Sequence, residues 1–585
     1  MRKFLPGLLL LALACNLITR GGVASTVTPA PVSATAPALP TATPQALPTA
    51  ALPSAPTVGL PPLPTVGLPS LPASTPAACI IRLQPGDVVV HPDPVLYSGD
   101  RVSFEIVAES ACAAWKGAQA ALYIGGTSGQ PLSTQSFGGY GLGGRLEAAF
   151  TWVWDTTGQV GPQTVVAEVR PPAEALQPPA VVTLTVNLLP SSQRPPLEAQ
   201  ARWEQVETDC CIIHYLSGTA AARDIATIQA EANQARQYDE ARLGVHRSQK
   251  IDFTMLSRLL GQGGFASSSI ALTYMDRNPV GNNLLILFRH EETHILDQGL
   301  VASRPALMAE GLAVYVAGGH FTPNENLPHR AAALLLLHRY IPLDDLADNF
   351  YPSQHETGYL EGSAFITYLV DTYGWDRFRQ FYQSFKPGPD REVLDKALTA
   401  SYGKDLSGME AEWLANLRTQ TVSPAEVDDL RLTLDLYDTL RRYQTQDDPS
   451  AYYLTAWVPD PLDAIRRGVT ADFLRHPDSS ENIALEVMLV DAEHALEAGQ
   501  YAEVETELNS VNAVLDAHNL FFDPLAATYL QIVDALSAAG YEAQTVSLDL
   551  TSREAATATA IRDWPTLETL TLTRTAEGWQ LSAAP

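Results

Sequence analysis

The feature that most restricts how this chain of 585 residues can fold is the pentapeptide His-Glu-Glu-Thr-His at positions 290–294. An apolar run, Leu-Leu-Ile-Leu-Phe, occupies 284–288 shortly before it, and leucines recur at 296 and 300. This spacing predicts a long, largely buried helix. Residues four apart lie on one face of a helix, about 40° apart around its axis. The two histidines can therefore bind one metal ion.

Glu291 lies about 100° further round the same helix, close enough to touch a water molecule bound to that metal. Zinc lowers the pKa of such a water to about 7, so that a neighbouring carboxylate can take its proton. The simpler alternative is a surface helix that carries two histidines and no metal. The pattern favours metal-assisted hydrolysis if a further ligand exists.

Glu310 is the candidate for that further ligand, because catalytic zinc usually has three protein ligands and one water. It is the only acidic residue in the apolar run 305–315, and a buried carboxylate is costly unless it is paired or bound to metal. Fifteen residues separate it from His294, which lets a second helix return antiparallel to the first. The alternative is an ion pair with Arg304 or Arg339.

The HEETH motif, followed by the Pro-x-x-x-x-Glu-Gly-Leu-Ala segment, resembles the gluzincin metallopeptidases, which include thermolysin and the aminopeptidase N group. Within them it is most similar to the smaller peptidase MA-like bacterial proteins. The resemblance covers about residues 205–420. It implies Zn²⁺ as the cofactor, with His290, His294 and Glu310 as metal ligands and Glu291 as the general base.

Two more elements extend the resemblance. The segment Gly358-Tyr359-Leu360-Glu361-Gly362 is similar to the Tyr-x-x-Gly segment of aminopeptidase N relatives, whose tyrosine hydrogen-bonds the oxyanion, and this implies the same role for Tyr359. In gluzincins an edge strand just before the HExxH helix binds the substrate backbone. The resemblance places that role on Gly264, Phe265 and Ala266, with a simple hairpin as the alternative.

The sequence also departs from the family pattern. Thermolysin has an aspartate one turn after its ligand glutamate, which supports a zinc histidine, whereas Val314 stands at that position here. Support must then come from elsewhere. Asp297 is a candidate, with ordinary surface exposure as the alternative. His320 and His355 lie among the predicted helices, where a packing or surface role is expected, and His355 is the one worth testing.

The N-terminus predicts export. Residues 1–15 combine a basic start with a short apolar stretch that fits a secretory signal. Its end, Leu-Ala-Leu-Ala-Cys15, resembles a bacterial lipobox, so we expect lipidation of Cys15 and a membrane anchor on the outer face of the cell, with ordinary cleavage and secretion as the alternative. Residues 16–78 are rich in Pro, Thr and Ala and predict an extended linker.

The expected fold is multidomain. A β-sandwich (Ig-like) domain is predicted at 79–190, an α+β zincin-like gluzincin metallopeptidase domain at 200–422, and an accessory domain of helices with a small sheet at 423–585. Trp152 and Trp154 are expected on one face of a strand, in the core or as a carbohydrate platform. The helices predicted for the middle domain cover 220–243, 282–299, 305–317, 328–340, 356–373, 375–385, 390–401 and 407–418.

The cysteines divide into two pairs if Cys15 is lipidated. Cys79 and Cys112 both fall in the predicted β domain and are expected to pair. Cys210 and Cys211 are neighbours. In a strand their side chains would face opposite ways and a bridge between them would be strained. Cys210 and Cys211 do not have the pattern of a metal site.

The net charge of −28 argues against nucleic acid or anionic lipid as a partner, because both require basic patches. The motifs predict a zinc-dependent peptidase that hydrolyses peptide or protein substrates at the cell surface. The alternative is a surface-displayed binding protein that keeps the zincin fold without catalysis.

Overall fold

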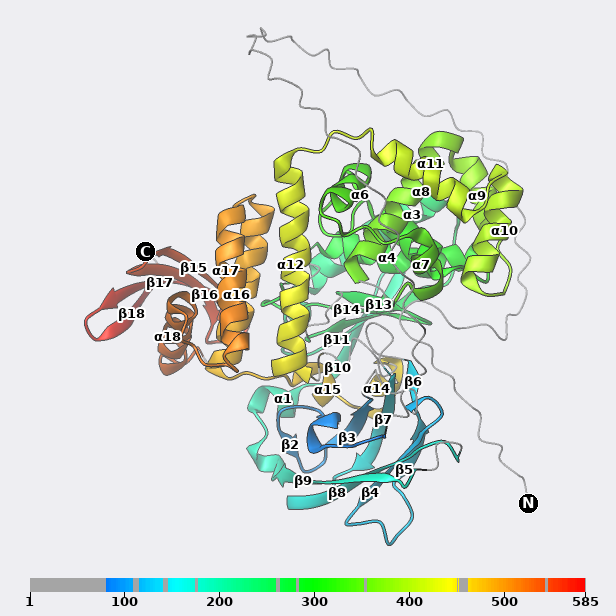
Figure 1. Ribbon diagram of the computed structural model, residues 1–585. Coiled ribbons are helices and arrows are strands. Elements are labelled where there is room, and N and C mark those ends of the chain that lie inside the picture. Colours follow the sequence, from blue (N-terminus) through cyan, green and yellow to red (C-terminus); the bar gives the residue numbers. More distant parts are fainter. Residues whose placement is uncertain are drawn as a thin grey trace. The chain divides into compact units, whose positions relative to one another are not determined.

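The computed structural model describes residues 80–108, 115–139, 146–173, 177–258, 263–279, 283–351, 355–449, 451, 461–541 and 545–583. Along the chain it has an N-terminal region rich in sheets, a central helical region and C-terminal helices with a small sheet (Figure 1). The signal segment, Cys15, the linker, Cys79 and Cys112 lie outside the described residues. None of the described helices combines the length and the apolar character needed to cross a bilayer.

Two sheets form the N-terminal region and share one apolar core. One has the order β1 (Val88–His91), β3 (Arg101–Val107), β7 (Leu146–Asp155), β6 (Gly138–Gly139), and the other β2 (Leu96–Tyr97), β9 (Ala180–Leu189), β8 (Gly161–Arg170), β4 (Gln119–Ile124), β5 (Ser133–Ser136). Phe104 and Phe150 of the first sheet and Leu122 of the second are fully buried in this core. Two sheets packed face to face are the arrangement of a sandwich.

A bulge in β7 separates the two tryptophans that were expected on one face. Val102 pairs with Trp154 and Phe104 with Phe150, so three residues of β7 stand opposite one residue of β3. At the centre of the bulge Trp152 has a φ of +49°. Trp154 stacks on Phe104 in the sandwich core, whereas Trp152 packs outside it, with its Nε1–H donating to Asp472 at 2.6 Å. The prediction of a shared face was wrong because Trp152 is itself a bulged residue and leaves the core, whereas Phe150 and Trp154 on either side of the bulge stay in it.

The central region begins with a five-stranded sheet in the order β10 (Trp203–Glu207), β11 (Cys211–Leu216), β12 (Ile251–Leu256), β14 (Ile270–Thr273), β13 (Gly264–Ala266). β11, β12 and β14 are parallel, while β13 is antiparallel to β14 and forms the edge. Helices α2 (Ala220–Arg223) and α3 (Ile225–Leu243) make the crossover that parallel strands require. Phe253 of β12 packs edge-on against Phe288, 5.0 Å between ring centroids.

The helices that follow match the predicted ranges within a few residues, with one addition. They are α4 (Leu284–Leu296), α5 (Ala306–Ala317), α6 (Leu327–Leu336), α7 (Leu343–Asn349), α8 (His355–Tyr373), α9 (Trp375–Gln383), α10 (Asp390–Tyr402) and α11 (Leu406–Leu417). Helix α7 was not predicted, because seven residues are too few to show a helical period.

Helices α5 and α8 touch through their backbones. A Cβ built on Gly311 of α5 would lie 2.5 Å from the carbonyl carbon of Gly362 on α8. In the reverse direction, a Cβ on Gly362 would lie 2.9 Å from the carbonyl oxygen of Leu307. Neither gap holds a methyl group, so both positions require glycine. Glu310 precedes one of these glycines and Tyr359 lies one turn before the other.

The C-terminal part consists of α12 (Pro424–Asp447), α14 (Pro461–Arg467), α15 (Ala471–Leu474), α16 (Ser480–Glu497), α17 (Tyr501–Asp516) and α18 (Pro524–Ala538), followed by the antiparallel sheet β15 (Thr545–Ser552), β16 (Ala555–Ile561), β17 (Leu567–Thr575), β18 (Gly578–Ala583). Figure 1 shows this sheet beside α16 and α18. In β16 alanines alternate with threonines and isoleucine, and Ala556, Ala558 and Ala560 are buried against the helices.

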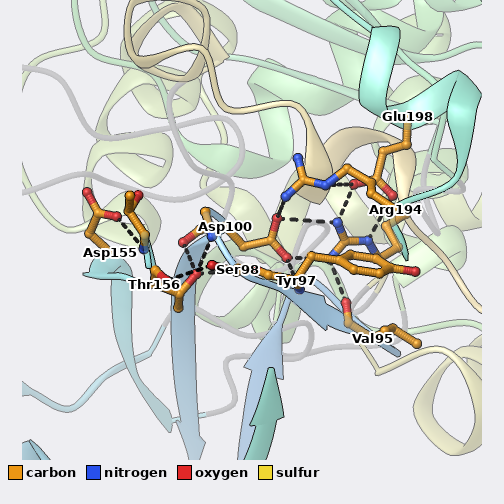
Figure 2. Close-up of polar contacts among 11 residues, drawn as sticks. Val95, Tyr97, Ser98, Asp100, Asp155, Thr156, Arg194 and Glu198 are labelled. Atoms are coloured by element: carbon orange, nitrogen blue, oxygen red, sulfur yellow. Dashed lines mark hydrogen bonds and ion pairs between the residues drawn. The ribbon is translucent and has the colours of Figure 1, made fainter. Parts of the chain in front are cut away.

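Arg475, just after α15, joins three parts of the chain. It forms ion pairs with Asp100 of the sandwich at 2.8 Å and with Glu198 of α1 (Pro196–Gln200), and its guanidinium lies 4.9 Å from the ring centroid of Tyr97. Figure 2 shows Asp100 and Glu198 converging with Arg194, which pairs with Asp100 at 2.6 Å. The side chains of Arg475, Asp100 and Glu198 are less than a tenth exposed. Removing one partner would leave buried charge without compensation.

We predict that Gly311→Ala lowers the free energy of unfolding by about 1–3 kcal/mol, because the added methyl overpacks a backbone contact that cannot yield. Urea denaturation of the full chain measures the change. Gly129→Ala is the control, since no atom lies within 4 Å of a Cβ built there, and it should stay within about 0.5 kcal/mol. Equal stability of Gly311→Ala and wild type would contradict the close crossing.

Arg475→Met should destabilise the protein by about 3–5 kcal/mol, since it leaves Asp100 and Glu198 with too little positive charge. Arg466→Met is the matched control, because the side chain of Arg466 is 62% exposed and its pair with Asp463 at 3.2 Å contributes little. Limited proteolysis of the two variants at the connection between β9 and β10 gives a second measurement. Equal cleavage rates would show that the buried ion pairs do not hold these parts together.

Candidate metal centre

Helix α4 carries the two histidines inward. Asn283 caps its first turn by accepting a hydrogen bond from the backbone N–H of Ile286 at 3.1 Å. His290 and His294 then lie one turn apart on the face toward α5. Glu310, in the middle of α5, points back at them and is fully buried. The residues predicted to share a metal are therefore brought together.

The three ligand atoms form a compact triangle. His290 Nε2 lies 3.2 Å from His294 Nε2, and Glu310 Oε2 lies 3.5 Å and 3.2 Å from these two nitrogens. Tetrahedral zinc with ligand distances of about 2.0–2.1 Å holds its ligand atoms roughly 3.3 Å apart. Two imidazoles and one carboxylate are also a usual donor set for catalytic zinc. The residues present fit a zinc ion.

Burial and charge act against each other in this triangle. Burial favours a neutral Glu310, but the histidines beside it hold the pKa of its carboxyl well below the ordinary value. Burial disfavours the charged form of His294, yet Glu310 raises its pKa. Burial also raises the pKa of Glu291, which is 3% exposed. The three candidate ligands and Glu291 thus lie close together, largely withdrawn from water, and their charges influence one another.

The edge strand β13 passes directly beside Glu291. A Cβ built on Gly264 would lie 3.3 Å from Glu291 Oε1, so a larger residue would crowd the carboxylate. The side chain of Phe265 points to an apolar cluster with Phe473, and that of Ala266 to the cluster under α4. Gly264 therefore lies against Glu291, whereas the side chains of the other two residues predicted to bind substrate pack in apolar clusters.

Tyr359 lies beside the histidines. Its ring centroid is 5.9 Å from that of His290, and it stacks on His320 with centroids 4.9 Å apart and 5° between the planes. Only 6% of Tyr359 is exposed. His320, expected to be a surface or packing residue, thus lies against the site. The side chain of His355 falls outside the described residues.

Tyr351 is a site residue that the sequence did not reveal. Its hydroxyl donates a hydrogen bond to Glu310 Oε1 at 2.7 Å, the oxygen on the far side from the histidines. It follows α7, the helix that no sequence pattern predicted. A tyrosine in an unassigned loop carries no signal of its proximity to a ligand.

Asp297 does not support a zinc histidine in the expected way. It is fully buried and accepts hydrogen bonds from Arg304 at 2.5 Å and from the Tyr382 hydroxyl at 2.6 Å. Among the described residues, Nδ1 of His294 has no hydrogen-bond partner. Arg304, which was the alternative partner for Glu310, forms an ion pair with Asp297. Its ion pair with Asp297 leaves Glu310 to the histidines and Tyr351.

A family model described as the Peptidase MA superfamily matches residues 283–419. That segment begins at the cap of α4 and contains the two histidines, Glu291, Glu310, Tyr351 and Tyr359. No curated protein matches the chain. The family match and the convergence of His290, His294 and Glu310 together support a zincin-like metallopeptidase centre in residues 283–419.

Proposed function

We propose that this protein is a zinc-dependent peptidase of the gluzincin type, which hydrolyses peptide bonds with an activated water. The observation that carries the proposal is the triangle of His290 Nε2, His294 Nε2 and Glu310 Oε2, with sides of 3.2–3.5 Å. Glu291 stands next to this triangle and makes no ion pair with an Arg or Lys of the described residues. It is thus available for proton transfer.

Substrate would bind along β13. The strand pairs with β14 on one side only, so its other edge offers backbone hydrogen bonds to an extended peptide. Gly264 lets that peptide approach Glu291 without a side chain in between. The substrate class that follows is a peptide or protein segment in extended form.

Zinc held by the two histidines and Glu310 would polarise the scissile carbonyl and lower the pKa of the attacking water to about 7. Glu291 takes the proton of that water as it attacks, and returns it to the leaving amine. The burial of Glu291 supports the second step, because a raised pKa makes its protonated form accessible. Tyr359 donates its hydroxyl hydrogen to the developing oxyanion.

Tyr351 has a different role in this scheme. Because its hydroxyl is bonded to Glu310 Oε1, it orients the carboxylate so that Oε2 faces the histidines. Export and lipidation of Cys15 stay predictions from the first fifteen residues. A cell-surface location follows only if they hold.

The amide variants of the two glutamates should fail differently. Glu291→Gln keeps its size but cannot accept a proton, so it should retain about one zinc per chain and lose nearly all turnover. Glu310→Gln loses an anionic ligand, so its zinc affinity should fall by about 10-fold or more, and added zinc should partly restore activity. Zinc content and hydrolysis of a mixed peptide library measure both.

Zinc bound as tightly by Glu310→Gln as by wild type would place the third ligand elsewhere. Wild type that binds zinc and library peptides without cleaving them would favour a non-catalytic binding protein.

Substitutions of the two tyrosines should also have different effects. Tyr359→Phe should lower kcat by about 10²–10³-fold with zinc content unchanged. Tyr351→Phe should weaken zinc binding by about 10-fold, and excess zinc should restore most of its kcat. Tyr368→Phe, on the same helix as Tyr359 and partly exposed, is the control and should resemble wild type. A kcat unchanged in Tyr359→Phe would remove that hydroxyl from the reaction.

A further inference from the structure

Cys210 and Cys211 form a disulfide between adjacent residues. Cys210 belongs to the turn after β10, whereas Cys211 is the first residue of β11. The backbone N–H of Cys211 donates to Thr208 Oγ1 at 3.0 Å, and that of Cys210 to Asn233 Oδ1 at 3.3 Å. The side chains of Cys210 and Cys211 were expected to face opposite ways, which holds for two neighbours within one strand. Only Cys211 belongs to the strand, and the turn at Cys210 brings both sulfurs to one side.

Glu292 meets these sulfurs from helix α4. It is fully buried, and its Oε1 lies 4.0 Å from Cys211 Sγ. The two sulfurs and one carboxylate oxygen all lie within 4.8 Å of one another. The other oxygen, Oε2, has no hydrogen-bond partner among the described residues. Helix α4 therefore carries the zinc ligands on one side and a second cluster of potential ligands on the other.

We propose that reduction of the Cys210–Cys211 disulfide creates a second metal site, in which the two thiolates and the Glu292 carboxylate bind a thiophilic divalent cation such as Zn²⁺ or Cd²⁺. In the disulfide each sulfur is bonded to the other and neither is a thiolate, which is the form that binds metal. The site thus exists only in the reduced protein. It is independent of the proposed peptidase activity.

The redox step needs a partner dithiol. That dithiol gives up two electrons and two protons and becomes a disulfide, while Cys210 and Cys211 become thiols through a mixed disulfide. Metal binding then displaces the two thiol protons. Cys210 is 8% exposed and the neighbouring Asp209 is exposed, so reductant and metal would enter at the turn.

The ligand set determines the class of ion. Two thiolates select soft or borderline metals over Ca²⁺ or Mg²⁺. Two sulfurs, one carboxylate oxygen and one water complete the four positions that Zn²⁺ or Cd²⁺ takes. The centre formed by His290, His294 and Glu310 contains no sulfur. A signal from metal–sulfur bonds therefore does not come from that centre, and cysteine variants separate the second site from the chain's other cysteines.

The test uses the full chain, reduced with a dithiol, freed of it without oxygen and titrated with Cd²⁺. We expect a thiolate-to-cadmium charge-transfer band that saturates near one ion per chain and is absent from the oxidised protein. Cys211→Ser should abolish it, while Cys79→Ser, the matched cysteine control, should keep it. Glu292→Gln should weaken Cd²⁺ binding by about 10-fold. A full band in Cys211→Ser, or no band in reduced wild type, would overturn the proposal.

A second measurement needs no substitution in the buried cluster. Alkylation of reduced wild type, followed by peptide mapping, compares the labelling of each cysteine with and without Cd²⁺. We expect Cd²⁺ to protect Cys210 and Cys211 together. Equal labelling of both residues in the two samples would rule the site out, whatever the variants do.

Discussion

Two helix backbones touch where α5 crosses α8, because Gly311 and Gly362 carry no side chains that could hold them apart. The residue before the first glycine is Glu310, the proposed third metal ligand, and the residue three positions before the second is Tyr359. A methyl group at the crossing would move both from the histidines of α4. This geometry explains the Tyr-x-x-Gly pattern. The glycine allows α8 to lie close to α5, and this short distance between the helices keeps Tyr359, one turn earlier on α8, near His290.

Buried charge elsewhere in the molecule is compensated across parts of the chain that are far apart in sequence. Arg475 pairs with Asp100 and Glu198, Arg277 with Glu486 at 2.5 Å, and Arg258 with Asp448 at 2.9 Å. Both side chains of each pair are almost wholly buried, so removing one partner would leave an uncompensated buried charge and lower the stability of the fold. These pairs make the sandwich, the central sheet and the C-terminal helices dependent on one another.

This dependence extends to the edge strand of the site. Phe265 of β13 shares one apolar cluster with Trp152 of the sandwich and with Ala464, Val469 and Phe473 of the C-terminal part. A role for the last third of the chain was not evident from its residue types. Its packing against the strand beside Glu291 links it to the site physically, although none of its described residues belongs to the triangle of candidate ligands.

The sequence determined the elements that depend on neighbours along the chain. Helix α4 and its two histidines, the helix with Glu310, and the place of Gly264 in an edge strand follow from helical period, proline, glycine and the cost of a lone buried carboxylate. Tertiary structure decided what depends on distant contacts. Tyr351 reaches Glu310 from a loop after a helix too short to predict, Asp297 binds Arg304 and Tyr382 in place of a histidine, and a bulge turns Trp152 out of the sandwich core. Cys210 and Cys211 meet Glu292 only because the fold brings the start of β11 and helix α4 into one buried cluster, and no spacing in the sequence encodes that contact.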